Sequence, residues 1–160
     1  MSSPGTPRVW VASPSEVAEV ARLLGEFRDF LGNSTPSVES IAKSVERIQA
    51  RGDGLYLLGE TEKDAPPAGV AQLRFRPSVW TGTEDAWLED LFVAEGARGS
   101  GLGRLLVEFG MDVARERGCA RIELDVQEEN EAALALYAAT GFDSKRAAPG
   151  GRALFMQRTL

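Results

Sequence analysis

The chain has 160 residues, of which 43% are hydrophobic and 26% are charged, as expected for one soluble globular domain with a buried core. Its formal net charge of −6 argues against nonspecific nucleic-acid binding, which depends on clustered lysine and arginine. The sequence has no histidine, the usual general base and metal ligand, and its only cysteine, Cys119, cannot form an intramolecular disulfide.

Residues 1–7 are polar and rich in proline and glycine, which predicts a disordered N-terminal tail before a single domain at residues 8–160. The opening MSSPGTPR lacks the apolar centre of a signal peptide. No apolar run approaches the ~20 residues that span a bilayer. We therefore expect a cytoplasmic protein without a metal ion, in which Cys119 is a small core residue.

The first half of the domain predicts a strand, two helices and an antiparallel meander. A strand at residues 8–12 precedes Ser13, Pro14 and Glu16, which are typical of a helix start, and that helix runs to about residue 30. A second helix begins near residue 37 and ends at RGDG, residues 51–54. The meander consists of strands at residues 55–60, 69–76 and 86–93, with Gly82 at the tip of the last turn.

The second half predicts alternating helices and strands. Helical spacing runs from Leu102 to near Gly118, and strand alternation covers residues 121–126. A short helix at residues 130–140 ends at Gly141, and a last hairpin pairs residues 142–146 with 153–159. We therefore expect an α/β (α+β) fold with a mixed, mostly antiparallel sheet of about seven strands and about four helices.

A glycine-rich turn, VAEGARGSGLGRLL (residues 93–106), separates the third meander strand from the following helix. Backbone N–H groups at such a helix start form an anion site, and two arginines, Arg98 and Arg104, add positive charge. The nucleoside-triphosphate loop is excluded, because Leu102-Gly103 stands where Lys-Ser/Thr is needed. The dinucleotide fingerprint is excluded because its third glycine would fall at Arg104.

Three segments in the right order resemble the GNAT superfamily of N-acetyltransferases. Residues 98–103 (RGSGLG) match its R/Q-x-x-G-x-G/A motif, residues 87–93 (WLEDLFV) its preceding strand, and residues 130–142 (NEAALALYAATGF) its N-x-x-A-x-x-x-Y-x-x-x-G-F segment. The similarity covers residues 86–142, about a third of the chain, and WLEDLFV is locally similar to the diamine (polyamine) acetyltransferase branch.

The resemblance implies a binding site for acetyl-CoA. Its loop would wrap the pyrophosphate, the backbone of the preceding strand would pair with pantetheine, and Asn130 would lie near pantetheine or an ordered water. The backbone N–H near Leu91 would be the oxyanion donor, and Tyr137 the general acid that protonates the departing sulfur. The implied acetyl-CoA-binding residues are Leu91, Phe92, Val93, Arg98, Gly99, Ser100, Gly101, Leu102, Gly103, Arg104 and Asn130.

Glu89 and Asp90 are the candidate residues for the acceptor amine. Adjacent strand residues face opposite sides unless a bulge intervenes, and GNAT enzymes commonly carry one here. With no histidine in the chain, Glu89 is the best candidate for the catalytic base, and the alternative is that it only orients the substrate. We expect Glu89, Asp90 and Asp125 to bind the acceptor.

The predicted function is acetyl transfer from acetyl-CoA to a primary amine of a small molecule, by direct attack in a ternary complex. Two alternatives stay open: a protein N-terminal or lysine acetyltransferase, and a non-catalytic acyl-CoA-binding domain. Acidic residues on the acceptor side favour a cationic substrate such as a diamine. The expected partners are this small molecule and, because many relatives dimerise, a second copy of the chain; neither nucleic acid nor a membrane is expected.

Overall fold

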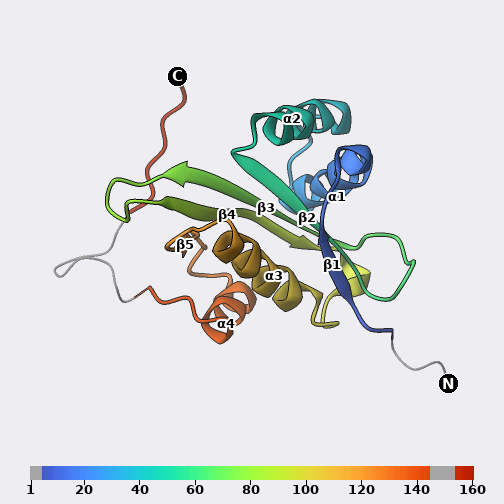
Figure 1. Ribbon diagram of the computed structural model, residues 1–160. Helices are drawn as coiled ribbons and strands as arrows, with labels where there is room; N and C mark the ends of the chain where they lie inside the picture. The colour runs from blue at the N-terminus through green and yellow to red at the C-terminus, as the bar shows by residue number, and fades with distance from the viewer. Residues whose placement is uncertain (1–4, 145–153) are drawn as a thin grey trace. The chain divides into compact units, whose positions relative to one another are not determined.

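The computed structural model describes residues 5–144 and 154–160 (Figure 1). The chain divides into two compact units, Met1–Asp125 and Val126–Leu160. The first unit contains, in chain order, β1 (Arg8–Val11), the one-turn helix η1 (Pro14–Glu16), α1 (Val17–Phe30), α2 (Val38–Arg51), β2 (Gly54–Glu60), β3 (Gly69–Pro77), β4 (Glu84–Val93), the one-turn helix η2 (Glu95–Ala97), α3 (Leu102–Glu116) and β5 (Ile122–Glu123). The second unit contains α4 (Glu131–Ala139).

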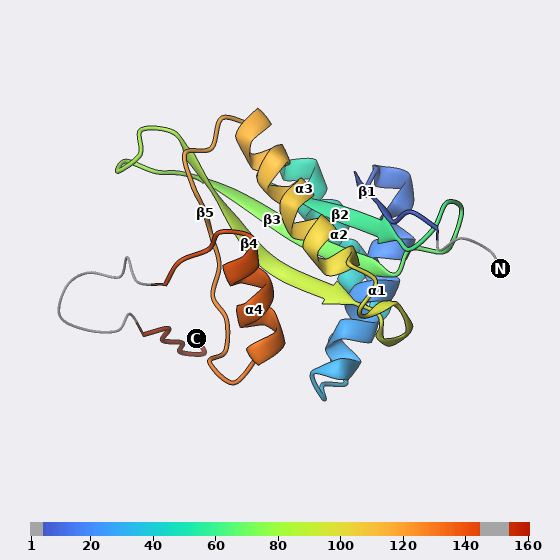
Figure 2. The same cartoon turned by 90° about the horizontal axis from the view of Figure 1, so that it is seen from below.

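The first unit is a three-layer arrangement around one mixed sheet. The strands lie in the order β1-β2-β3-β4-β5, antiparallel from β1 to β4 and parallel between β4 and β5. Helices α1 and α2 lie on one face of this sheet (Figure 1), and α3 lies along the other (Figure 2). The sequence prediction of a mixed, mostly antiparallel sheet is therefore confirmed for this unit.

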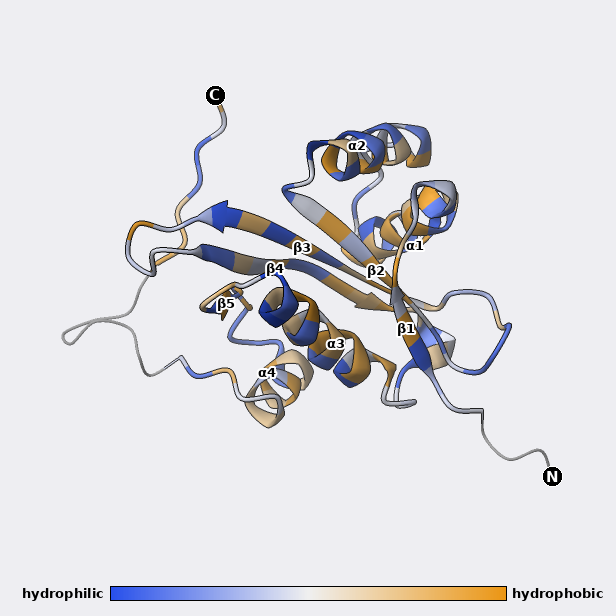
Figure 3. Cartoon of the chain, viewed as in Figure 1, coloured by the Kyte–Doolittle hydropathy of each residue, from blue (hydrophilic) through white to orange (hydrophobic). Residues whose placement is uncertain are grey.

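Alternating side chains divide the sheet residues between its two faces. Tyr56, Leu58, Val70 and Phe92 belong to a core cluster with apolar residues of α1 and α2. Gly59 and Gly69 face α3 instead, because a Cβ atom on either would lie within 3 Å of a leucine of that helix. Figure 3 shows the same alternation as hydrophilic and hydrophobic segments along β3 and β4. Both β2 and most of β3 are buried at nearly every position, as expected for strands that are covered by helices on both faces.

The helix boundaries follow the sequence signals closely. The backbone N–H of Ser13 donates to Glu16 Oε2 at 2.8 Å, and α1 then begins at Val17. Ser37 caps α2 by accepting from the backbone N–H of Ser40, and Gly52 ends the helix with φ = 73°. The helix start predicted at Pro14 is the one-turn helix η1, which leads directly into α1, and α2 lies within a residue or two of its predicted bounds.

The described residues contain five strands rather than about seven, so the strand count is corrected. The expected fifth strand, residues 121–126, is reduced to Ile122–Glu123, because alternation predicts extended backbone but a strand also needs a hydrogen-bonded partner. The expected last hairpin covers residues 142–146 and 153–159. Its described parts, residues 142–144 and 154–160, form no strand, and residues 145–153 lie outside the described residues.

Within the second unit, α4 has the expected start and end. Asn130 Oδ1 accepts a hydrogen bond from the backbone N–H of Ala133 at 3.1 Å, which makes Asn130 the N-cap of the helix. Gly141 follows the helix with φ = 93°. The ring of Tyr137 packs edge-on against Phe142, with ring centroids 5.6 Å apart. Among the described residues no helix of either unit is both long and apolar enough to cross a membrane.

Candidate active site

The glycine-rich turn between η2 and α3 exposes backbone donors. Gly99 and Gly101 have φ values of 78° and 85°, which L residues with a Cβ rarely adopt. The backbone N–H groups of Gly99, Ser100 and Gly101 have no hydrogen-bond acceptor among the described residues. A Cβ at Gly99 or Gly101 would meet no atom within 4 Å, so the space in front of the turn is open. The turn and the start of α3 together suit an anion.

Two side chains of the predicted loop have partners within the first unit. Arg98 Nε donates to the carbonyl of Val93 at 3.1 Å, and Arg104 Nε donates to Glu108 at 2.7 Å along the exposed side of α3. Ser100 Oγ donates to the carbonyl of Ala97 at 2.6 Å and stabilises the turn. Hydrogen bonds thus hold both arginine side chains next to the turn.

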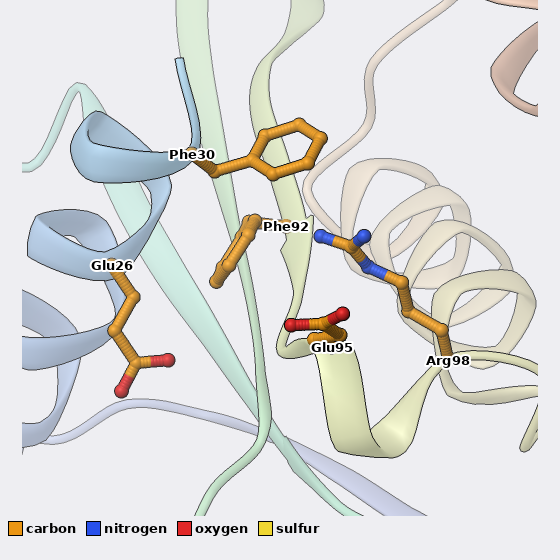
Figure 4. A pocket seen from close by; sticks show the side chains of 5 residues that line it. All are labelled: Glu26, Phe30, Phe92, Glu95 and Arg98. Carbon is orange, nitrogen blue, oxygen red and sulfur yellow. The ribbon is translucent and has the colours of Figure 1, made fainter. Parts of the chain in front are cut away.

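A pocket of about 330 Å³ lies beside this turn (Figure 4). Its lining residues are Glu26, Phe30, Phe92, Glu95 and Arg98. The guanidinium of Arg98 lies over the ring of Phe30, with its central carbon 4.6 Å from the ring centroid. Phe92 is held from behind by Phe27, at a centroid separation of 5.3 Å. The pocket is thus lined by two aromatic rings and three charged side chains.

A β-bulge in β4 settles which way Glu89 and Asp90 face. Gln72 of β3 pairs with Asp90 and Leu73 pairs with Leu88, so Glu89 is the extra residue without a partner. Asp90 shares the α1/α2 face with Gln72, and the Glu89 carboxylate lies 3.7 Å from Arg74, on that same face. The bulge therefore brings two consecutive carboxylates to one side of the sheet.

The two carboxylates have different surroundings. Asp90 is half-buried, and burial, with the nearby charges of Glu89 and Asp125, raises its pKa from 3.8 to about 6. Glu89 is exposed and faces the positive charge of Arg74. Glu89 and Asp125, the other two residues expected to bind the acceptor, therefore lie close enough to Asp90 for their charges to raise its pKa. A carboxylate with a pKa near 6 is a better proton acceptor than an ordinary aspartate.

Three further residues of this face were not predicted from the sequence. Tyr56 and Gln72 are buried in the same row as Asp90, and Arg74 follows two residues after Gln72. Burial, then the charges of Asp90 and Glu89, raises the pKa of Tyr56 to about 12, while Arg74 acts in the opposite direction. The sequence does show two polar residues, Gln72 and Arg74, on one face of a predicted strand. Only the pairing of β3 with β4 shows that this face also carries Asp90.

The edge of β4 beyond the bulge is open toward β5. Parallel pairing between these strands covers only Ala86 with Ile122 and Trp87 with Glu123. Within the described part of the first unit, no β5 residue pairs with Leu91, Phe92 or Val93. The edge of β4 is therefore unpaired with β5 at the three residues expected to bind a cofactor through their backbone.

Metal binding and cysteine catalysis, neither of which the sequence predicts, can be checked in the described ranges, residues 5–144 and 154–160. No group of three or more histidine, cysteine, aspartate and glutamate side chains there could hold a metal ion. Cys119 is half-buried rather than fully buried, and burial and Glu84 raise the pKa of its thiol. A raised pKa lowers the thiolate fraction, the form that a catalytic cysteine needs.

Comparison with known proteins identifies the family. Residues 22–142, about three quarters of the sequence, match the acetyltransferase (GNAT) family. The chain belongs to this family. The matched range includes every residue predicted here for the GNAT site, from Glu89 to Tyr137.

Relatives of this GNAT chain act on different small molecules by name. It is 44% identical over 68 residues to the mycothiol acetyltransferase of Beutenbergia cavernae, covering 41% of this chain and 23% of that protein. It is 38% identical over 79 residues to the streptothricin acetyltransferase of Streptomyces lavendulae, covering 49% of this chain and 40% of that protein. It is 30% identical over 114 residues to the thialysine N-epsilon-acetyltransferase of Caenorhabditis elegans, covering 71% of this chain and 67% of that protein. The match thus spans less than half the length of the first two relatives.

A solved GNAT structure agrees with the fold over the whole chain. An acetyltransferase-family protein from Arthrobacter sp. FB24 superposes with a TM-score of 0.83 at 33% sequence identity, covering 100% of this chain and 99% of that one. The open turn before α3 lies within the residues that match the acetyltransferase (GNAT) family. The named relatives differ in their substrates, so the acceptor must be inferred from residues of this chain.

Proposed function

We propose that this chain transfers the acetyl group of acetyl-CoA to a primary amine of a small molecule, by direct attack in a ternary complex. The observation that carries the proposal is the bulge at Glu89, which places two carboxylates on one face of β4, a few residues before the open anion-binding turn. An anionic carrier and a cationic acceptor would therefore bind to one strand and the loop that follows it.

The turn fits the pyrophosphate of acetyl-CoA. The free N–H groups of residues 99–101, the start of α3 and the charges of Arg98 and Arg104 all favour an anion, and the glycines leave room for close approach. The open backbone of Leu91–Val93 suits pantetheine. Bound acetyl-CoA supplies the thioester carbonyl that an amine attacks.

We assign the proton-accepting role to Asp90 in preference to Glu89, the sequence-based candidate. An attacking amine must lose its proton, and a base works best when its pKa lies near the working pH. Asp90, with a pKa of about 6, is mostly ionised at neutral pH yet more basic than an ordinary carboxylate. Glu89 is exposed and suits the complementary task of holding and orienting the ammonium group.

The remaining two roles rest on the family resemblance. Tyr137, on α4, is proposed to protonate the departing sulfur, and the backbone N–H near Leu91 to donate to the oxyanion. Asn130 already caps α4, which supports a structural role beside any contact with the cofactor. A cytoplasmic location and a homodimer stay predictions of the sequence.

The test measures release of the CoA thiol with a panel of amines and, separately, with lysine-containing and free N-terminal peptides. We expect release with small amines and kcat/KM values for peptides at least about 10-fold lower. Tyr137→Phe keeps the ring and should lower kcat without changing the KM for acetyl-CoA. A preference for peptides would support a protein acetyltransferase instead, and acetyl-CoA binding without thiol release would support a non-catalytic binding domain.

A further inference from the structure

Arg74 is the one arginine of β3 that lies beside the two acceptor carboxylates. It pairs across the sheet with Gly54 on β2 and Trp87 on β4, so its side chain is on the α1/α2 face. A Cβ at Gly54 would lie 2.9 Å from Arg74 Cδ and 3.2 Å from Nε. Gly54 therefore leaves the space that lets the arginine stem lie flat on the sheet, which fixes the guanidinium near Glu89.

The guanidinium is poorly matched by its neighbours. Its terminal nitrogens lie 3.7 Å from Glu89 Oε2 and 3.9 Å from Asp53 Oδ2, both beyond hydrogen-bond distance. Its Nε is buried with no hydrogen-bond partner in the described part of the chain, and so is Asp53 Oδ1. By contrast, Arg117 Nε makes a 2.7 Å ion pair with Glu84. A guanidinium has five N–H donors in a planar fork, so Arg74 has donors to spare for a ligand.

The charge of Arg74 also bears on which acceptor fits. A polyamine brings only positive charges, which Glu89 and Asp90 attract but which a guanidinium 3.7 Å from Glu89 repels. An acceptor that carries a carboxylate as well as an amine complements both signs. A carboxylate matches the guanidinium fork with two parallel hydrogen bonds and would satisfy donors that are otherwise unmatched.

We propose that Arg74 binds a carboxylate of the acceptor, so that the acceptor is an amino acid and not a diamine. This inference rests on the proposed function, because it names the substrate class of the same site. When the acceptor carboxylate pairs with Arg74, the carboxylate of Glu89 can bind the acceptor's ammonium group instead of facing Arg74. Arg74 is thus a specificity-determining residue that neither the sequence motifs nor the family match identifies.

The experiment compares two matched pairs that differ only by a carboxylate: L-lysine with cadaverine, and L-ornithine with putrescine. We expect wild-type kcat/KM to be about 10- to 100-fold higher for each amino acid, because a hydrogen-bonded charge pair of this kind contributes that factor. Arg74→Gln should reduce the ratio toward 1 in two ways: it should raise the KM of the amino acids, and it should lower the KM of the diamines because the charge that repels them is removed. Arg74→Lys, which keeps the charge without the fork, should give an intermediate ratio.

Arg76→Gln is the matched control, since Arg76 is also on β3 but pairs with Glu123 at 3.3 Å. It should leave the ratio at the wild-type value, and thermal unfolding should show that all variants are folded. Equal turnover of both members of each pair by wild type, or an unchanged ratio in Arg74→Gln, would overturn this inference while the proposed function stands. If none of the amines led to release of the CoA thiol, both this inference and the proposed function would be overturned.

Discussion

The proposed anion-binding turn and the proposed acceptor face of this GNAT-family chain are built on opposite physical principles. The turn is formed by consecutive residues, 98–104, and offers mainly backbone N–H groups held by glycines at positive φ. The acceptor face gathers side chains from three strands: Tyr56 on β2, Gln72 and Arg74 on β3, and Glu89 and Asp90 on β4. One region depends on backbone conformation and the other on the burial and pairing of charge.

Because of this difference, the two regions should respond differently to substitutions and to pH. A backbone site should fail when a residue cannot adopt the required φ, and should be nearly indifferent to charge-neutral changes elsewhere. A side-chain site should respond to the loss of a single carboxylate and to pH, because its groups are coupled through a partly buried environment. The following predictions test that contrast.

Asp90→Asn should give the largest effect, a fall of about 10²- to 10⁴-fold in kcat/KM for the amine, which is the usual contribution of a positioned general base. Glu89→Gln is the matched control and should lose less, mainly through the KM of the amine. In the wild type, kcat/KM should rise with pH through about 6 as Asp90 ionises, and Asp90→Asn should lack that step. A larger loss in Glu89→Gln than in Asp90→Asn would return the base role to Glu89.

Gly101→Val should raise the KM for acetyl-CoA by about 100-fold, corresponding to about 3 kcal/mol of strain at a φ of 85°. A Cβ at this position would meet no atom within 4 Å, so the expected loss comes from the strained backbone. Gly96→Ala is the control, since Gly96 has neither a positive φ nor a neighbour within 4 Å. Steady-state kinetics with a fixed amine measures both variants. An unchanged KM in Gly101→Val would show that the turn does not hold the carrier.

The same contrast explains what could be predicted from the sequence. The turn, the four helices and the cap at Asn130 follow from residues close together in the chain, and local spacing is sufficient for these. The bulge at Glu89 could be anticipated only from the family resemblance. The positions of Tyr56, Gln72 and Arg74 beside Asp90 depend on strand register between segments far apart in sequence, which no local pattern specifies. The strand β5 is likewise shorter than the predicted residues 121–126, because only Ile122 and Glu123 pair with β4, although the alternation continues in the sequence.

The raised pKa of Asp90 also predicts a cost in stability. A carboxyl group whose folded pKa lies above its unfolded value contributes stability at low pH that is lost as pH rises, here between about 4 and 6. Asp90→Asn should therefore raise the free energy of unfolding at pH 8 by about 1 to 2 kcal/mol, a figure reduced because the side chain is only half-buried. Urea unfolding at pH 8 measures this gain, which should shrink below pH 4. A less stable variant at pH 8 would contradict the assigned environment.

The smallest effect is expected where the two regions meet, at the ring of Phe30. The central carbon of the Arg98 guanidinium lies 4.6 Å from the centroid of that ring, and we propose that the guanidinium leaves the ring when it binds a phosphate in front of the turn. Phe30 is 62% exposed, so this contact contributes only about 0.5 to 1 kcal/mol. Phe30→Ala should therefore lower the KM for acetyl-CoA by about 2- to 5-fold, since a contact that competes with the carrier is removed. Leu31→Ala, the adjacent exposed control, should leave that KM unchanged. A higher KM in Phe30→Ala would mean that the ring assists carrier binding, and Arg98 would then act from its present position.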